Sequence, residues 1–163
     1  MIDLYPAATP NGHKVSIALE ELALPYRLHV LDLNAGAQKR PQFLAINPNG
    51  RIPAIVDRAA DDFAVFESGA ILQYLGRKTG KFYPADERAR VAVDEWLFWQ
   101  MGGLGPMFGQ LGFFHKFAGK DYDDKRPRER YVAEAKRLLG VLEQRLANRQ
   151  WVMGDAYTIA DIA

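Results

Sequence analysis

The stretch that decides the fold is residues 47–75, NPNGRIPAIVDRAADDFAVFESGAILQYL. Pro53 stands at the entry of the apolar run IPAIV, where it would remove a ladder hydrogen bond from a central strand, so we expect a turn or a strand edge there. Glu67 and Ser68 then open a helix whose apolar residues recur at helical spacing. Exposed backbone at such a turn, beside a helix N-terminus, forms a cradle for a small anionic peptide. We therefore expect the binding site in this stretch.

The pattern around this stretch predicts a mixed α/β domain over residues 1–80. Strands are expected at residues 2–5 and 26–33, with a helix between them that ends near Pro25. A short helix at 40–46, strands at 52–57 and 63–66, and a helix at 67–79 ended by Gly80 are expected next. The order β-α-β, linking helix, β-β-α is that of a thioredoxin-like domain, a mixed sheet with helices on both faces.

Residues 87–163 predict an all-helical second domain, reached through the linker KFYPADE. One helix is expected from Arg88 to about Gly102, with a break or kink at Pro106. Another is expected from Pro127 to Asn148, where apolar residues recur at steps of three and four.

Composition excludes several classes of function. Lysine and arginine total 21 against 20 acidic residues, a balance that disfavours a nucleic-acid partner. No apolar run is long enough to span a membrane, and the first residues, MIDLYPAATP, lack the features of a signal peptide, so we expect a cytoplasmic protein. The three histidines show no metal-ligand spacing, and no metal site is expected.

The chain contains no cysteine. It therefore has no disulfide, no Cys-X-X-Cys pair and no thiolate nucleophile of its own. If the protein carries out thiol chemistry, the sulfur must arrive on a small molecule.

Several motifs together resemble those of the cytosolic glutathione transferases. They are LYPAATPNGHKVSIALEE at residues 4–21, NPNGRIPAIVD at 47–57 and VFESGAILQYL at 65–75. WLFWQMGGLGPMFGQLGFF at 96–114 resembles more specifically the bacterial Nu-class group, which contains glutathione-dependent disulfide-bond reductases. The resemblance implies the glutathione transferase fold, glutathione as co-substrate, a homodimer, and glutathione-dependent reduction of small disulfides. A conjugating transferase or a non-catalytic binding module of the same fold are the alternatives.

The resemblance also leads us to expect a truncated C-terminal domain. Thr158 to Asp161 resembles the family's capping box, in which the threonine hydroxyl and the acid satisfy amides at a helix start. Members of the family continue for several helices beyond this point, whereas this chain ends at Ala163.

By resemblance, Asn11 is the residue expected to contact the glutathione thiol, with Thr9 beside it. A hydroxyl or amide donor stabilises a thiolate by hydrogen-bonding its charged form, and a helix N-terminus adds to the effect. TPNG also suits a plain turn and N-cap, which is the structural alternative. Tyr5, at the end of the first strand, is placed behind Asn11 as packing at the edge of the site.

The remaining binding residues are carried over in the same way. A cis Ile52–Pro53 bond would leave the Ile52 amide and carbonyl free for the ligand's cysteinyl backbone, the alternative being a trans proline at a strand edge. Glu67 and Ser68 suit the γ-glutamyl group, or act only as caps. Gln38 is expected at the glycyl end, and Arg130 supplies a cation to a carboxylate, with Arg128 or a solvated helix start as competitors.

Aromatic and methionine side chains are concentrated in the second domain. We interpret them as domain core and dimer contact, and alternatively as a pocket for an apolar or disulfide substrate. The set comprises Trp96, Phe98, Trp99, Met101, Met107, Phe108, Phe113 and Phe114.

Overall fold

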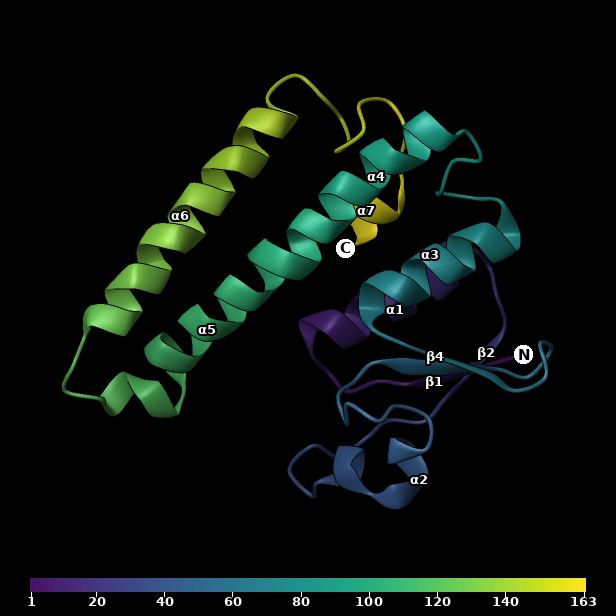
Figure 1. The fold of residues 1–163 in the computed structure, drawn as a ribbon, viewed down its shortest axis with the longest axis horizontal. Coiled ribbons are helices and arrows are strands. Elements are labelled where there is room, and N and C mark those ends of the chain that lie inside the picture. The colour runs from purple at the N-terminus through teal and green to yellow at the C-terminus, as the bar shows by residue number, and fades with distance from the viewer. The chain divides into compact units, whose positions relative to one another are not determined.

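A computed structural model describes residues 1–163, the whole chain, and divides it into two units. The first comprises Met1–Ala85 with Ile162–Ala163, and the second comprises Asp86–Asp161. The first unit is a sheet with helices, and the second is helical (Figure 1). Both match the glutathione transferase fold expected from the sequence.

The first unit is built on a four-stranded mixed sheet in the order β2-β1-β3-β4. Strand β1 (Ile2–Tyr5) pairs in parallel with β2 (Tyr26–Leu28) and antiparallel with β3 (Ala54–Asp57). Strand β4 (Phe63–Phe66) closes the other edge, antiparallel to β3. The predicted mixed sheet is confirmed.

Two strands are shorter than the sequence predicts. Strand β2 ends at Leu28 rather than residue 33, although the His29 and Leu31 amides still donate to the Leu4 and Pro6 carbonyls. This edge segment carries exposed apolar side chains, Leu28 at 52% and Val30 at 66%, so no buried face holds it in a regular ladder. Strand β3 begins only after Pro53, because proline cannot donate to the ladder.

Helices cover both faces of this sheet (Figure 1). Helices α1 (Pro10–Glu21) and α3 (Ser68–Thr79) lie together on one face, and the short α2 (Pro41–Leu44) lies on the other. Gly80 ends α3 in the left-handed conformation, as predicted. The fully buried hydrophobic side chains between sheet and helices include Leu4, Val15, Leu19, Ile55, Ile71, Leu72 and Leu75.

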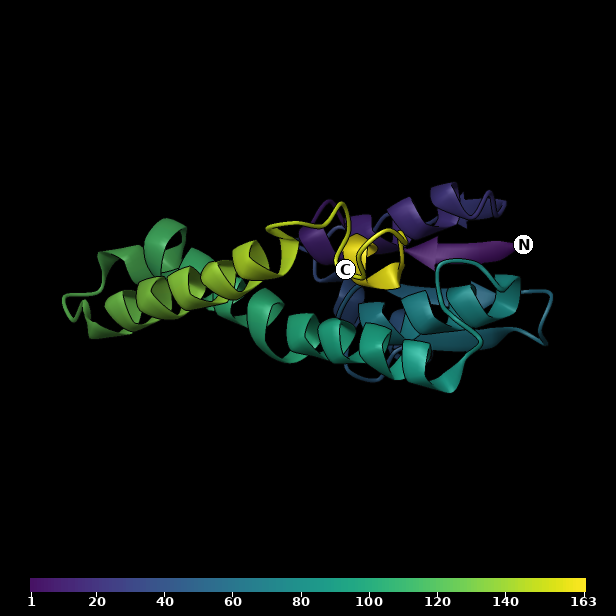
Figure 2. The ribbon, with the colours of Figure 1, turned by 90° about the horizontal axis from the view of Figure 1, so that it is seen from above.

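The second unit contains α4 (Glu87–Trp99), α5 (Gly105–Lys116), α6 (Arg126–Leu146) and the start of α7 (Ile159–Ile162). Helices α5 and α6 lie side by side in both views (Figures 1 and 2). None of the helices is both long and apolar enough to cross a membrane.

The irregularity predicted at Pro106 lies a few residues earlier. A π-helical segment at Gln100–Leu104 joins α4 to α5, and Pro106 falls in the first turn of α5, where its missing N–H costs little. Residues 105–116 lie in the part of the chain predicted to be all-helical and form α5, although their glycines lower helix propensity. Packing of α5 against α6 outweighs that preference.

The aromatic set does not form a single cluster. Phe113 and Phe114 contact Tyr122 and Tyr131 at the α5–α6 connection, around Gly119, where any Cβ would lie 2.8 Å from both phenylalanines. Trp96 and Trp99 pack edge to face, with their ring centroids 5.2 Å apart. Phe98 is 64% exposed and so is not core.

The predicted capping box is confirmed within the second unit. The Asp161 carboxylate accepts hydrogen bonds from the Thr158 amide at 2.8 Å and the Val152 amide at 2.7 Å, and the Thr158 hydroxyl accepts from the Ala160 amide at 3.2 Å. The Thr158 hydroxyl thereby satisfies an amide in the first turn of α7, and the Asp161 carboxylate satisfies the amide of the residue that precedes the helix.

A buried ion pair joins the last residue of β3, Asp57, to Lys78 of α3. The Asp57 carboxylate, fully buried, accepts from the Lys78 ammonium at 2.7 Å and the Tyr74 hydroxyl at 2.6 Å. Burial raises the pKa of Asp57, but hydrogen bonds from Lys78, Tyr74 and the Ala59 amide outweigh it and leave the pKa below its usual value. The pair therefore stabilises the fold while Asp57 is ionised.

Replacing Lys78 with methionine should lower the free energy of unfolding by about 2 kcal/mol at pH 7, because a buried carboxylate would lose its cation. A lowered carboxyl pKa contributes stability above the unfolded value of about 3.9 and loses it as the pH falls through the folded value. The difference between variant and wild type should therefore shrink below about pH 4. Urea unfolding from pH 7 to 3 measures this.

Lys81→Met is the matched control, since Lys81 is exposed and makes no ion pair. An equal loss of stability in both variants, or a Lys78→Met deficit that does not change with pH, would contradict the assigned role of Asp57.

Candidate functional site

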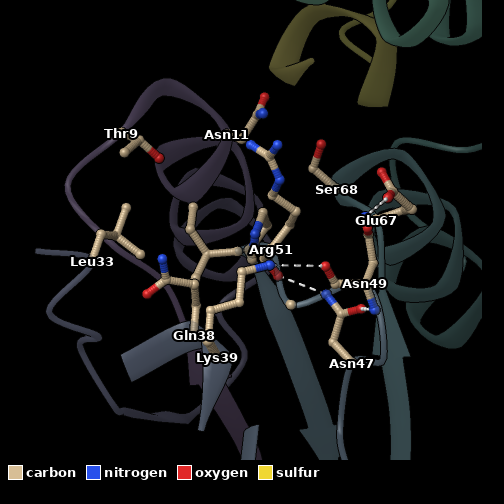
Figure 3. Close-up of a pocket in the computed structure, with 13 residues that line it drawn as sticks. Thr9, Asn11, Leu33, Gln38, Lys39, Asn47, Asn49, Arg51, Glu67 and Ser68 are labelled. Atoms are coloured by element: carbon tan, nitrogen blue, oxygen red, sulfur yellow. Dashed lines mark hydrogen bonds between the residues drawn. The ribbon is translucent and has the colours of Figure 1, made fainter. Parts of the chain in front are cut away.

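A cavity of about 520 Å³ opens in the first unit, at one end of the sheet (Figure 3). Its lining comes from the start of α1, the segment before α2, the loop that precedes β3, and the start of α3. The lining residues are Thr9, Asn11, Leu33, Gln38, Lys39, Asn47, Asn49, Gly50, Arg51, Ile52, Pro53, Glu67 and Ser68.

The strand register brings these segments together. Tyr5, the last residue of β1, pairs with Ala54, the first residue of β3. Ala54 in turn pairs with Phe66, the last residue of β4. The segments that follow Tyr5, precede Ala54 and follow Phe66 therefore lie together at one end of the strands.

Thr9 and Asn11 mark the start of α1. Thr9 is the N-cap, and its hydroxyl accepts a hydrogen bond from the Gly12 amide at 3.4 Å. The capping role left open by the sequence is therefore real for Thr9, which also lines the cavity. The Asn11 side chain is exposed and makes no hydrogen bond within the protein, so its amide remains available to a ligand.

The Ile52–Pro53 peptide is cis, as predicted. Ile52 precedes β3, and neither its N–H nor its carbonyl makes a hydrogen bond within the protein. Ile52 is also among the residues that line the cavity. Its N–H and carbonyl can therefore pair with an extended peptide as an added strand would.

Glu67 and Ser68 open α3 with an unusual backbone. Glu67 has φ 69° and ψ 119°, a region that costs free energy for a residue with a Cβ. Its carboxylate is contacted by the Asn49 side-chain amide at 3.5 Å. Ser68 is buried at the first helical position, at the positive end of the helix. Strain of this kind is typical of functional sites.

Three charged side chains line the cavity without an ion-pair partner in the protein. Lys39 and Arg51 carry positive charge, and Glu67 carries negative charge. Lys39 contacts only the Asn49 carbonyl, at 3.5 Å, and Arg51 extends toward the end lined by Asn11 (Figure 3). Gln38 adds a buried side-chain oxygen without a hydrogen-bond partner. The cavity therefore suits a ligand that carries carboxylate groups as well as an ammonium group.

The structure gathers most of the predicted site residues at this cavity. Those present are Thr9, Asn11, Gln38, Ile52, Pro53, Glu67 and Ser68. Arg130 belongs to the second unit and lines a different cavity, with Met107 and Tyr131 among its neighbours. Tyr5 does not line the first cavity; its ring stacks on His29, with centroids 4.7 Å apart.

Sequence reasoning missed Leu33, Lys39, Asn47, Asn49, Gly50 and Arg51. Four of these lie in the NPNGR segment that the sequence had singled out, so the signal was present but no role was attached to each residue. The structure contains no group of three or more histidine or acidic side chains placed to hold a metal ion.

Two family models match the chain. The N-terminal domain of glutathione S-transferase matches residues 8–78, and the C-terminal domain matches residues 105–163. The Disulfide-bond oxidoreductase YfcG of Escherichia coli strain K12 is 52% identical over 167 residues, which cover 100% of this chain and 77% of that protein.

Solved structures agree with this match. A glutathione transferase family member from Pseudomonas fluorescens, with two glutathione bound, superposes with a TM-score of 0.97 at 56% identity, covering 99% of this chain and 73% of that one. A glutathione transferase from Pseudomonas putida, with one glutathione disulfide bound per subunit, gives 0.95 at 53% identity, with 99% and 71% covered.

Gly50, which lines the cavity, should not tolerate a side chain. It has φ +59°, and a Cβ there would lie 2.8 Å from Lys39 Nζ and 3.1 Å from both the Gln38 carbonyl and Leu44 Cδ2. We expect Gly50→Ala to lose about 1 kcal/mol for the left-handed backbone and about 1–3 kcal/mol more for the contacts. Thermal unfolding measures the loss.

Gly36→Ala is the matched control, because Gly36 has φ +66° but nothing within 4 Å of the added Cβ. It should pay only the backbone cost. Equal losses in the two variants would show that the wall around Gly50 is not tightly packed.

Proposed function

This chain belongs to the glutathione S-transferase family, and on that premise we propose that it is a glutathione-dependent disulfide-bond oxidoreductase in which glutathione supplies both redox sulfurs. Its relative YfcG is named a disulfide-bond oxidoreductase. The absence of cysteine from the chain supports the proposal, because every reacting sulfur must then come from a ligand.

The charge pattern of the cavity is the observation that carries this proposal. Glutathione has two carboxylates, one ammonium and one thiol. The cavity offers two cations, Lys39 and Arg51, and one carboxylate, Glu67, none of them neutralised by an ion pair within the protein. The lining therefore complements the ligand charge for charge.

Each part of the tripeptide has a matching group in this proposal. Glu67 and Ser68, at the start of α3, hold the γ-glutamyl ammonium and carboxylate, where the helix end favours an anion. The free N–H and carbonyl of Ile52 pair with the cysteinyl backbone, beside Pro53. Gln38 and Lys39 face the glycyl carboxylate. We also propose that Arg130 supplies a cation to a carboxylate.

The chemistry is thiol–disulfide exchange. The Asn11 amide, with the Thr9 hydroxyl beside it, stabilises one glutathione as thiolate, assisted by the N-terminus of α1. This thiolate attacks one sulfur of the substrate disulfide, forms a mixed disulfide and expels the other sulfur as a thiolate. A second glutathione attacks the glutathione sulfur of the mixed disulfide, which releases glutathione disulfide and the second substrate thiol. The related structures contain two glutathiones or one glutathione disulfide, which are the reduced and oxidised forms of glutathione in these exchange steps.

We further propose a cytoplasmic homodimer. Reduced glutathione is maintained in the cytosol, where this reaction would have its reductant. A partner subunit would cover apolar side chains that the chain leaves exposed, such as Phe63 at 52%, Val91 at 49% and Phe98 at 64%. Val91 and Phe98 lie seven residues apart and so share one face of α4.

Asn11→Ala should lower the rate of glutathione-dependent reduction of hydroxyethyl disulfide by about tenfold or more, the effect of removing a hydrogen bond to a charged group. Asn34→Ala, an exposed asparagine outside the cavity, should match the wild type. Wild-type turnover at the uncatalysed rate, or an unaffected Asn11→Ala variant, contradicts the proposal. Faster turnover of a chloronitrobenzene than of the disulfide would favour the conjugating transferase instead.

Phe98→Asp should convert the dimer to a monomer in analytical ultracentrifugation, because a charge in an apolar interface is costly to desolvate. Phe117→Asp, at an equally exposed residue of the α5–α6 connection, should leave the dimer intact. A monomeric wild type, or identical sedimentation of all three proteins, contradicts the assigned interface.

A further inference from the structure

One buried polar residue organises the cavity wall without a role of its own in the proposed chemistry. Asn47 is only 1% exposed, the least accessible polar side chain at the cavity. Its amide nitrogen donates to the Arg51 carbonyl at 2.6 Å, and its amide oxygen accepts from the Asn49 N–H at 2.9 Å. The Gly50 N–H also donates to the Asn47 carbonyl at 2.9 Å. Every residue from 47 to 51 except Pro48 is thereby tied to Asn47.

Asn49, which Asn47 holds in place, contacts two charged groups. Its carbonyl contacts the Lys39 ammonium at 3.5 Å, and its side-chain amide contacts the Glu67 carboxylate at 3.5 Å (Figure 3). Both contacts are long for hydrogen bonds, so they orient the two charges and leave them available to a ligand. Lys39 and Glu67 come from separate segments of the chain, and Asn49 touches both.

We propose that Asn47 is a positioning residue for the glutathione cavity. Its buried amide fixes Asn49, and Asn49 holds the Lys39 ammonium and the Glu67 carboxylate at the spacing that the two ends of the tripeptide require. This inference rests on the proposed function, since it takes glutathione as the ligand. It predicts that the affinity for glutathione depends on the hydrogen bond between the Asn47 side chain and the Asn49 amide. This effect on affinity should be separable from any effect on the stability of the fold.

The first test is a thermodynamic cycle on affinity for reduced glutathione, measured by isothermal titration calorimetry. Asn47→Ala and Lys39→Met should each raise Kd by about tenfold, the effect of weakening one charged contact. Because Asn47 acts through both Lys39 and Glu67, the double variant should raise Kd by more than tenfold but by clearly less than the hundredfold product of the single effects, since coupled residues are not additive. A rise of about a hundredfold would mean independent effects and would overturn the proposal.

The second test separates positioning from stability. In Asn47→Ser the hydroxyl can still accept from the Asn49 amide as an ST-turn, but it lacks the donor to the Arg51 carbonyl. We expect both variants to lose thermal stability, because both leave the Arg51 carbonyl without its donor, while the serine variant keeps Kd within about threefold of the wild type. Equal losses of affinity in the two variants would overturn the proposal.

Asn49→Ala keeps the proposal testable if Asn47→Ala fails to fold, because Asn49 is exposed. It removes the link to Glu67 and should raise Kd, whereas Asn34→Ala should not; an unchanged Kd in Asn49→Ala would overturn the proposal.

The wild-type measurement separates the two levels of inference. A wild type that does not bind glutathione overturns the proposed function, and a wild type that binds while both asparagine variants bind equally well overturns only the role of Asn47.

Discussion

The pairing of β3 with both of its neighbours is the constraint on which the cavity depends. Because Tyr5 pairs with Ala54 and Ala54 with Phe66, three chain segments far apart in sequence are brought together at one end of the strands. A shift of register by one residue would turn every side chain of β3 to the other face. The same shift would separate Ile52 from Asn11 and Ser68. The Asp57 carboxylate resists such a shift, because the present register places it beside the Lys78 ammonium and the Tyr74 hydroxyl of α3.

The cavity combines a rigid frame with charges that remain free to bind. Buried aliphatic side chains and the Asp57–Lys78 pair hold the sheet and α3 together away from the cavity. At the cavity itself, Lys39, Arg51 and Glu67 lack ion-pair partners within the protein. A free charge contributes little to folding but attracts a charged ligand, so stability and binding are supplied by different residues. A chain without cysteine fits this division, because the reactive sulfur is part of what binds.

Much of this architecture could be predicted from residue patterns. Alternation and helical spacing located β1, β4, α3 and α6 to within a few residues, and Pro53 marked the entry of β3. The errors fell where local preference and packing disagree. The irregularity expected at Pro106 lies instead in the π-helical segment Gln100–Leu104, and Pro106 falls in the first turn of α5, which packs against α6. The predicted strand at 26–33 lies at a sheet edge, where nothing beyond the hydrogen bonds of one neighbour keeps it regular.

By itself the sequence determined the order of elements, the need for an external thiol, and the motifs that line the cavity. Periodicity and composition are local properties, so these could be read without coordinates. Only the tertiary structure decided which residues share the cavity: it added Lys39, Asn47, Asn49 and Arg51 to the predicted set, and it placed Arg130 at a different cavity. The physical reason is that a contact such as Asn49 to Glu67 spans 18 residues and exists only after the strands have paired.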